Sequence, residues 1–102
     1  MSKQPEFDSD GYPTDKTLRR IREWPGETLC DLPAFVCEAW SYPDRAVVGE
    51  EKKTLYLSTG GWSGNEDIIG ALQANHIFWL LAWTKSVRGG HYWFDLGRLE
   101  KA

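Results

Sequence analysis

Long apolar runs and cysteines are scarce in this chain, and each scarcity excludes a class of protein. The longest uninterrupted apolar stretch, 77–83, has seven residues, whereas a membrane-spanning helix needs roughly 18. We therefore expect no membrane partner. The two cysteines, Cys30 and Cys37, lie seven positions apart without the partner spacing of a zinc site. No signal-peptide pattern precedes them, so we expect free thiols and a cytoplasmic location.

Basic charge and histidine are also in short supply. The chain has 12 Lys and Arg against 15 Asp and Glu, a formal net charge of -3. A nucleic-acid-binding domain would need a basic face, so we do not expect nucleic acid as the partner. The two histidines, His76 and His91, have no recognisable metal-ligand spacing with acidic residues. We expect no metal and no cofactor, and no Ser-His-Asp or Cys-His pattern stands out.

Aromatic residues, by contrast, are plentiful. They make up 14% of the chain and include six tryptophans. Tryptophan is rarely needed so often for packing alone, so we expect some of the six to line a surface or pocket; the simpler interpretation, that all are core residues, stays open. A chain of 102 residues holds one hydrophobic core but not two, which predicts a single domain.

The chain divides into an arm and a domain. Residues 1–13 are acidic, contain two prolines and have almost nothing to bury, so we expect a flexible arm followed by one domain over 14–102. Thr14 is a typical helix N-cap, with Asp15 in the first turn. The helix should end before Pro25. Its basic residues form either a solvated face or a patch for an acidic partner.

The remaining pattern predicts strands and one more helix. We expect strands over 35–41 and 54–58 joined across a charged loop (43–53), with 42–44 ending the first strand. A helix is expected over 65–75, followed by a hairpin of 77–86 with 91–96. These elements predict an α+β fold: a four-stranded, mainly antiparallel sheet with two helices on one face, in the order α-β-β-α-β-β. Because 77–83 would be apolar on both strand faces, another subunit is expected to cover it, as in a homodimer.

A glycine-containing loop between the 54–58 strand and the 65–75 helix is the first candidate site. Gly60 and Gly61 allow positive φ and close approach of a ligand to the backbone. Ser63 and Glu66 match a capping box at the start of the helix. A helix N-terminus favours an anion, but Glu66 and the next residue, an aspartate, would compete with it. An anion would then need a cation from elsewhere, for which Arg88 is the natural candidate.

The second candidate site is the turn and strand at 88–93. Two glycines suffice for a tight turn, but arginine, histidine and aromatic residues surround them. Arginine binds phosphate or carboxylate in a bidentate manner, and aromatic rings stack on bases. The two segments could also be an ordinary capped turn and an ordinary hairpin. The candidate ligand-binding residues are Thr59, Gly60, Gly61, Trp62, Ser63, Asn65, Glu66, Arg88, His91 and Trp93.

The segments 58–66 (STGGWSGNE), 78–79 (FW) and 88–92 (RGGHY) together resemble small proteins of tailed phages and prophages. The resemblance covers roughly residues 12–96. It carries no established activity, so it assigns no catalytic residue. It implies a protein expressed in a host cytoplasm, where small phage proteins often block a host component or sequester a small molecule.

Three functions follow as hypotheses. The first is a binding protein for a small polar, partly flat ligand such as a nucleotide or a nucleotide-derived signal, with Trp62 or Trp93 stacking on it. The second is a protein-interaction module that inhibits a host defence protein through the acidic arm and exposed tryptophans. The third is a small hydrolase that uses Glu66 and His91 as its acid-base pair.

Overall fold

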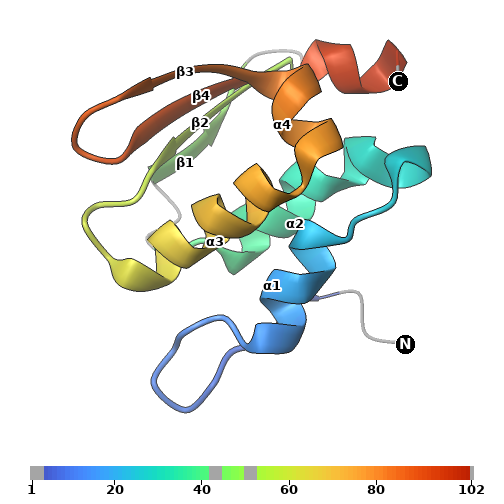
Figure 1. The fold of residues 1–102 in the computed structure, drawn as a ribbon. Helices are drawn as coiled ribbons and strands as arrows, with labels where there is room; N and C mark the ends of the chain where they lie inside the picture. Colours follow the sequence, from blue (N-terminus) through green and yellow to red (C-terminus); the bar gives the residue numbers. More distant parts are fainter. Residues whose placement is uncertain (1–3, 42–44, 50–52, 102) are drawn as a thin grey trace.

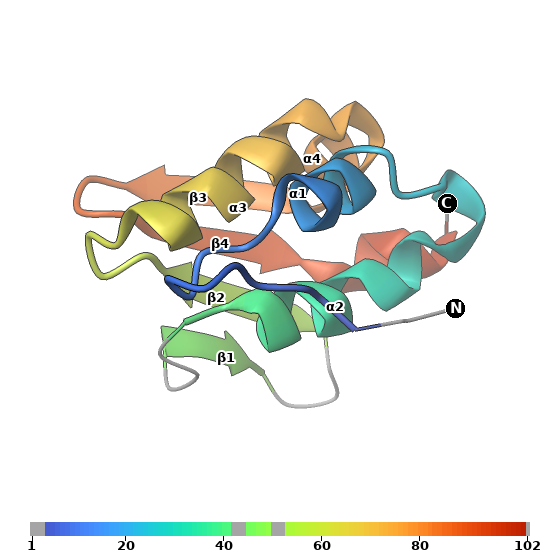
Figure 2. The same ribbon diagram turned by 90° about the horizontal axis from the view of Figure 1, so that it is seen from below.

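Four β-strands form one antiparallel sheet, and the helices cover one of its faces. In Figure 1 the sheet lies above the helices, and in Figure 2, seen from below, the helices lie in front of it. The computed structural model describes residues 4–41, 45–49 and 53–101. Among these residues, no helix combines the length and apolar character needed to cross a membrane.

The helices are α1 (Asp15–Arg22), α2 (Leu32–Ala39), α3 (Ser63–Ala74) and α4 (His76–Ala82), with the 3-10 helices η1 (Gly26–Asp31) and η4 (Leu96–Lys101). The strands are β1 (Ala46–Val48), β2 (Thr54–Ser58), β3 (Trp83–Val87) and β4 (His91–Asp95), in the sheet order β1-β2-β4-β3. The predicted α+β class with a four-stranded antiparallel sheet is confirmed. The exact predicted order α-β-β-α-β-β is not confirmed: the observed order is α-α-β-β-α-α-β-β, in which the additional helices α2 and α4 occupy parts of the segments expected as strands.

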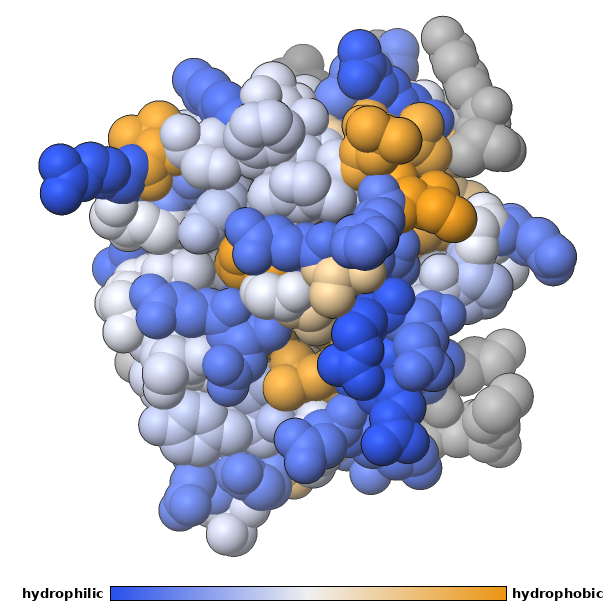
Figure 3. All heavy atoms as spheres, viewed as in Figure 1, coloured by the Kyte–Doolittle hydropathy of each residue, from blue (hydrophilic) through white to orange (hydrophobic). Residues whose placement is uncertain are grey.

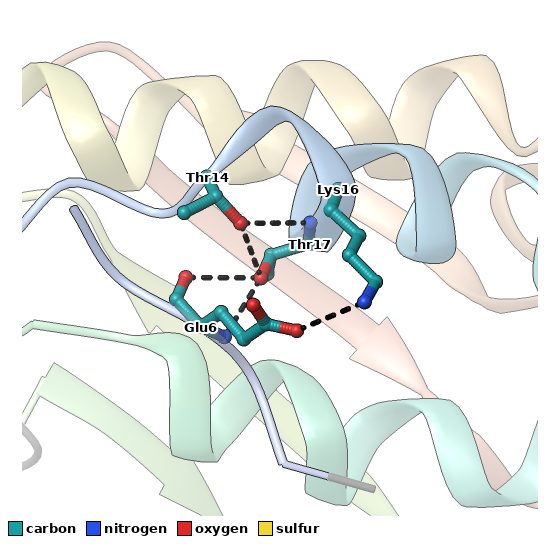
Figure 4. Close-up of polar contacts among 4 residues, drawn as sticks. All are labelled: Glu6, Thr14, Lys16 and Thr17. Atoms are coloured by element: carbon teal, nitrogen blue, oxygen red, sulfur yellow. Dashed lines mark hydrogen bonds and ion pairs between the residues drawn. The ribbon is translucent and has the colours of Figure 1, made fainter. Parts of the chain in front are cut away.

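The start of α1 follows the sequence signal. The Thr14 hydroxyl accepts a hydrogen bond from the backbone N–H of Thr17 at 3.2 Å, as an N-cap does. The buried Thr17 hydroxyl in turn donates to the carbonyl of Glu6 at 2.9 Å and accepts from the Glu6 N–H at 2.8 Å (Figure 4). Lys16 adds an exposed ion pair to the Glu6 carboxylate at 3.4 Å. These contacts attach the N-terminal arm to the helix.

The described part of the arm, 4–13, makes more contacts than its sequence indicated. Phe7 and Pro13 form an isolated β-bridge, and Pro13 is buried. The Asp8 carboxylate accepts from the backbone N–H groups of Asp10 and Tyr12 at 2.9 and 3.0 Å, which closes the turn between them. The polar residues that predicted a loose arm therefore form a hydrogen-bonded loop, through bonds within the arm that composition does not reveal.

The segment predicted as the first strand, 35–41, lies mostly in α2. Leu32, Phe35, Val36 and Ala39 are buried and recur at helical spacing, with Pro33 in the first turn, where proline is tolerated. A short run of bulky apolar residues fits the spacing of a helix as well as that of a strand. Here the residues form a helix, because this buries one apolar stripe in the core. The strand that precedes β2 in the chain and pairs with it is β1, inside the predicted loop 43–53. The predicted break at 42–44 lies outside the described residues.

The helix α3 was predicted, whereas α4 replaces the first part of the predicted strand 77–86, and only the rest of that segment lies in β3. Asn75 ends α3, and its side-chain carbonyl accepts from the N–H of Phe78 at 3.2 Å, so one residue ends one helix and caps the next. Phe78 and Ala82, four positions apart, are buried, whereas Leu80 between them is 80% exposed. That arrangement belongs to a helix, because a strand would place all three on one face. The hairpin turn at 88–90 was predicted, and its strands are the shorter β3 and β4.

The sheet has one covered face and one open face. Leu55, Leu57 and Phe94 are almost completely buried and belong to the core. The strand alternation places Tyr56 and Trp93 on the opposite face, directly across from each other in the β2–β4 register. Because the helices lie on the core side (Figure 2), no described helix covers this second face, and Tyr56 and Trp93 are partly exposed on it.

Candidate functional site

The two loops predicted as the site meet at one end of the sheet. The N–H of Thr59 donates to the carbonyl of Gly90 at 2.9 Å, and the Thr59 side chain also accepts from the Gly61 N–H at 3.3 Å. The hydrogen bond between Thr59 and Gly90 joins the β2–α3 loop to the β3–β4 turn. Both segments lie at the left of the molecule in Figures 1 and 2. The structure therefore brings the two candidate segments together where Ser58 pairs with His91.

The glycines of both loops have a geometric role. Gly60 and Gly61 have φ of 62° and 78°, and Gly89 and Gly90 have φ of 98° and 83°. Residues with a side chain rarely adopt such φ values. A Cβ at Gly90 would also collide with the hydroxyl of Thr59. These glycines therefore allow the two loops to approach each other.

Trp62 is held by packing within the chain. Its ring stacks on Tyr12 of the arm, with centroids 4.9 Å apart and planes 14° apart. Its six-membered ring lies against Gly64, where a Cβ would collide with it. The glycine after Trp62 is therefore explained by close contact with the ring. Trp62 thus already has an aromatic partner from a segment 50 positions away in the sequence.

The predicted capping box is absent. α3 begins at Ser63, its N-cap is Trp62, and no side chain caps it. The Ser63 hydroxyl instead donates to the hydroxyl of Tyr12 at 3.4 Å, and the N–H groups of Asn65 and Glu66 donate to the carbonyl of Trp62. The helix starts two residues earlier than the predicted 65–75, because the extended Trp62 already accepts its first backbone hydrogen bonds.

Asn65 is a structural residue in the described contacts. It is completely buried, and its side-chain carbonyl accepts from the N–H of Ser41 at 2.9 Å. Its amide group donates to the carbonyls of Ser41 and Thr59 at 3.1 and 3.3 Å. With these bonds formed, the side chain has little capacity left for a ligand. Glu66, by contrast, lies exposed in the first turn of α3.

The open face of the sheet carries a row of aromatic rings, which we name the aromatic face: Tyr56, His91, Trp93 and the adjoining Lys85. The rings of Tyr56 and Trp93 are 4.9 Å apart, and the Tyr56 hydroxyl lies 2.6 Å from Nδ1 of His91. Nζ of Lys85 lies 4.5 Å from the centroid of the Trp93 ring, which is cation–π distance. His91 and Trp93 were predicted site residues, whereas Tyr56 and Lys85 were missed. Strand alternation in 54–58 already places Tyr56 on the other face of the strand from Leu55 and Leu57. The sequence did not indicate that this strand pairs with β4, which brings Tyr56 to Trp93.

Arg45 supplies a cation at the glycine loop. A Cβ at Gly60 would lie 3.4 Å from both Cδ and Nε of Arg45, so the guanidinium group passes directly beside the loop. Arg88, the predicted cation, is exposed in the β3–β4 turn. No described residue forms an ion pair with Arg45 or Arg88. Sequence reasoning missed Arg45 because it belonged to a predicted loop, distant from Gly60 along the chain.

A second region, beside α1 and α2, is hollowed. Two adjoining depressions of about 340 and 330 Å³ share Arg20, Trp24 and Thr28 as lining residues. Cζ of Arg20 lies 5.2 Å from the centroid of Trp24 and 4.9 Å from that of Phe35. Three carboxylate residues, Glu23, Asp31 and Glu38, also line the hollows. Their negative charge disfavours an anionic ligand, so this region is a poorer anion site than the aromatic face.

The two histidines, His76 and His91, lie on different elements, α4 and β4. The described residues contain no cluster of three His, Cys, Asp or Glu side chains that could hold a metal ion. His76, which follows the predicted helix 65–75, is the first residue of α4 and is exposed. His91 already shares a short hydrogen bond with Tyr56.

The two thiols should differ in reactivity. Both cysteines are free; Cys30 is exposed, and Cys37 is partly buried. Burial raises the pKa of the Cys37 thiol, and the neighbouring Glu38 carboxylate raises it further. Because the thiolate is the reactive form, Cys37 should react with a disulfide reagent several-fold more slowly than Cys30 at neutral pH. The labelling rate of Cys37 should keep rising to a higher pH than the rate of an ordinary thiol, because its raised pKa delays formation of the thiolate.

Single variants Cys30→Ser and Cys37→Ser, followed by absorbance during labelling, measure the two rates separately. Equal rates in the folded protein would contradict the burial of Cys37, and labelling in denaturant provides the control in which the difference should disappear.

No family model, curated protein or solved structure matches this chain in sequence or fold comparison.

Proposed function

We propose that this chain is a non-enzymatic binding protein for a small, flat, anionic ligand, with a nucleotide or a nucleotide-derived signal as the best-fitting class. The aromatic face and the adjoining loop edge around Gly60 form the site. The observation that carries the proposal is the solvent-facing ring pair Tyr56–Trp93, with Arg45 beside Gly60 at the end of the same strands.

Stacking would supply the binding of the flat part of the ligand. Aromatic side chains on an open sheet face accept any base, since every base has a π-face, and each stacked base contributes about 1–3 kcal/mol. The Trp93 ring is at present covered by the Lys85 ammonium group. On binding, this flexible side chain would move from the ring to the phosphate, so that the ring and the cation both gain a partner.

The cations would supply the binding of the anionic part. Arg45 lies beside Gly60, and Arg88 lies exposed in the turn whose Gly90 contacts the same loop. Guanidinium groups bind phosphate with paired hydrogen bonds. Glu66 and Asp67 at the start of α3 oppose an anion at that helix end, which is why the proposal places the phosphate at Arg45.

Isothermal titration calorimetry tests the proposal with adenosine and guanosine 5′-monophosphates, a cyclic dinucleotide, the free nucleosides and inorganic phosphate. We expect a nucleotide to bind more tightly than the nucleoside or phosphate alone, because only the nucleotide engages both rings and cations. Trp93→Leu and Arg45→Gln should each weaken binding by about 10-fold or more, from the lost stacking and the lost charged hydrogen bonds.

The matched control is Arg22→Gln, which removes an exposed arginine from α1 and should leave the affinity unchanged. The proposal fails if no nucleotide binds at millimolar concentration, or if Trp93→Leu and Arg45→Gln bind as well as the original protein while remaining folded.

A second candidate is an interaction module that inhibits a host protein, in the phage context that the resemblance implies. The observation that favours it is the arm: Phe7 is about half exposed on a loop that carries Asp8 and Asp10. Such an apolar side chain among acids is typical of an interface hot spot with a basic rim on the partner. Capture of a host protein that Phe7→Ser abolishes, without any nucleotide binding, would favour this candidate over the first.

A further inference from the structure

The surface formed by α4 and the start of β3 is unusually apolar. Ile77, Leu80 and Trp83, which we name the α4–β3 surface, are 54%, 80% and 40% exposed. Ile77 and Leu80 lie three positions apart and therefore on one side of α4, and Trp83 follows as the first residue of β3. Figure 3 shows hydrophobic residues gathered over α4, at the upper right of the view. A leucine that is four-fifths exposed gains almost nothing from packing within its own chain.

The same part of the molecule carries an open strand edge. β3 is the last strand in the sheet order, it pairs with β4 on one side only among the described strands, and all five of its residues are exposed. An unpaired edge of this kind can pair with another strand. The irregularity between Trp83 and Lys85 leaves only Lys85–Val87 in regular register, so backbone pairing alone would be weak and would need the apolar contacts of α4 beside it.

The charge of this region favours a second copy of the chain as the occupant. From 76 to 87 the only charged side chain is Lys85, and its ammonium group lies over Trp93 on the open face. A two-fold interface brings a surface against itself, so any charge there would repel its own copy. In a chain whose residues are 26% charged, a neutral apolar surface next to a free edge fits self-association better than a charged partner.

We infer that the protein forms a two-fold homodimer in which the β3 edges pair antiparallel and the α4 helices pack across the axis. A two-fold axis perpendicular to the sheet relates neighbouring antiparallel strands, so it would join the two four-stranded sheets edge to edge. Both helix layers would then lie on one side and both aromatic faces on the other. The dimer is independent of the proposed ligand, because its contacts lie on α4 and the outer edge of β3.

Size-exclusion chromatography with light scattering at about 10 to 500 µM tests this inference, with Leu80→Glu and Leu80→Lys as variants. The original protein should show twice the mass of the chain, and each variant alone should show the mass of one chain, because like charges would meet across the axis. An equimolar mixture of the two variants should recover the dimer mass, since opposite charges then meet. A change in folding would not produce that recovery, and circular dichroism should show the same helix content in all forms.

The matched control is Val48→Glu, which places the same charge on β1, the opposite edge of the sheet, at a residue that is 43% exposed. It should remain a dimer. A monomer at every concentration of the original protein overturns the inference. So does a dimer that survives Leu80→Glu, a Val48→Glu protein that dissociates, or a variant mixture that stays monomeric. Nucleotide titration of the same samples reports on the proposed function separately.

Discussion

Replacing Phe78 with alanine should lower the free energy of unfolding by about 3–5 kcal/mol, the range for truncating a buried phenylalanine. The Phe78 side chain is completely buried, and its ring lies 5.5 Å from that of Phe94, where α4 packs on β4. A domain of this size is stable by roughly 5–15 kcal/mol, so the variant should unfold at a much lower denaturant concentration. Urea unfolding followed by circular dichroism measures the change.

The matched control is Leu80→Ala, two positions away on the exposed side of α4. It should change the stability by about 0.5 kcal/mol or less when measured at a concentration low enough to separate the copies. If Phe78→Ala proves too unstable to purify, Phe78→Leu keeps most of the volume and should cost less than about 1.5 kcal/mol. Equal losses at Phe78 and Leu80 would indicate a strand, in which both side chains share a face, and would contradict α4.

Replacing Asn65 with alanine should cost about 2–4 kcal/mol. The change removes three hydrogen bonds at once and leaves the N–H and carbonyl of Ser41 and the carbonyl of Thr59 without a side-chain partner. Buried polar groups without a partner each cost about 1–3 kcal/mol, although the groups of Ser41 can regain water. Thermal unfolding should show the loss as a fall of roughly 4–8 °C in Tm for each kcal/mol.

Gln73→Ala, at an exposed position of the same helix, is the control and should be nearly neutral. Asn65→Asp should be worse than alanine at neutral pH, because a carboxylate would face the two carbonyl oxygens in a buried site. Burial raises the pKa of such a carboxyl group, so this variant should gain stability as the pH falls and its acid protonates. A ligand-binding role for Asn65 without a structural one would instead leave the stability of Asn65→Ala unchanged.

Local sequence signals were sufficient for some of the elements. Thr14 before an acidic first turn predicted the start of α1, and the apolar spacing of Ile68, Ile69 and Leu72 predicted α3. The paired glycines at 89–90 predicted the β3–β4 turn. In each case the information lies within a few residues, because caps, helical stripes and turns are local interactions.

The failures share one physical cause. The segments 35–41 and 77–83 are short, apolar and aromatic, so their side chains suit the face of a helix or a strand equally well. The choice depends on what they pack against: Phe78 against Phe94, and the α2 stripe against the core that contains β2. In the case of α4, the cap from Asn75 was a local signal for a helix, and the same side chain donates to the carbonyls of Ile21 and Trp24 at the end of α1.

By itself, the sequence determined the α+β class, the first and third helices, the glycine turns and the region in which Thr59 and His91 would become candidates. Only the tertiary structure decided what the residues of this region contact. It placed Tyr12 on Trp62, buried the Asn65 amide among backbone groups, and aligned Tyr56 with Trp93 beside Lys85. It also brought Arg45 to Gly60. These pairs are distant along the chain, and their contact depends on strand pairing and helix packing, which local propensities do not specify.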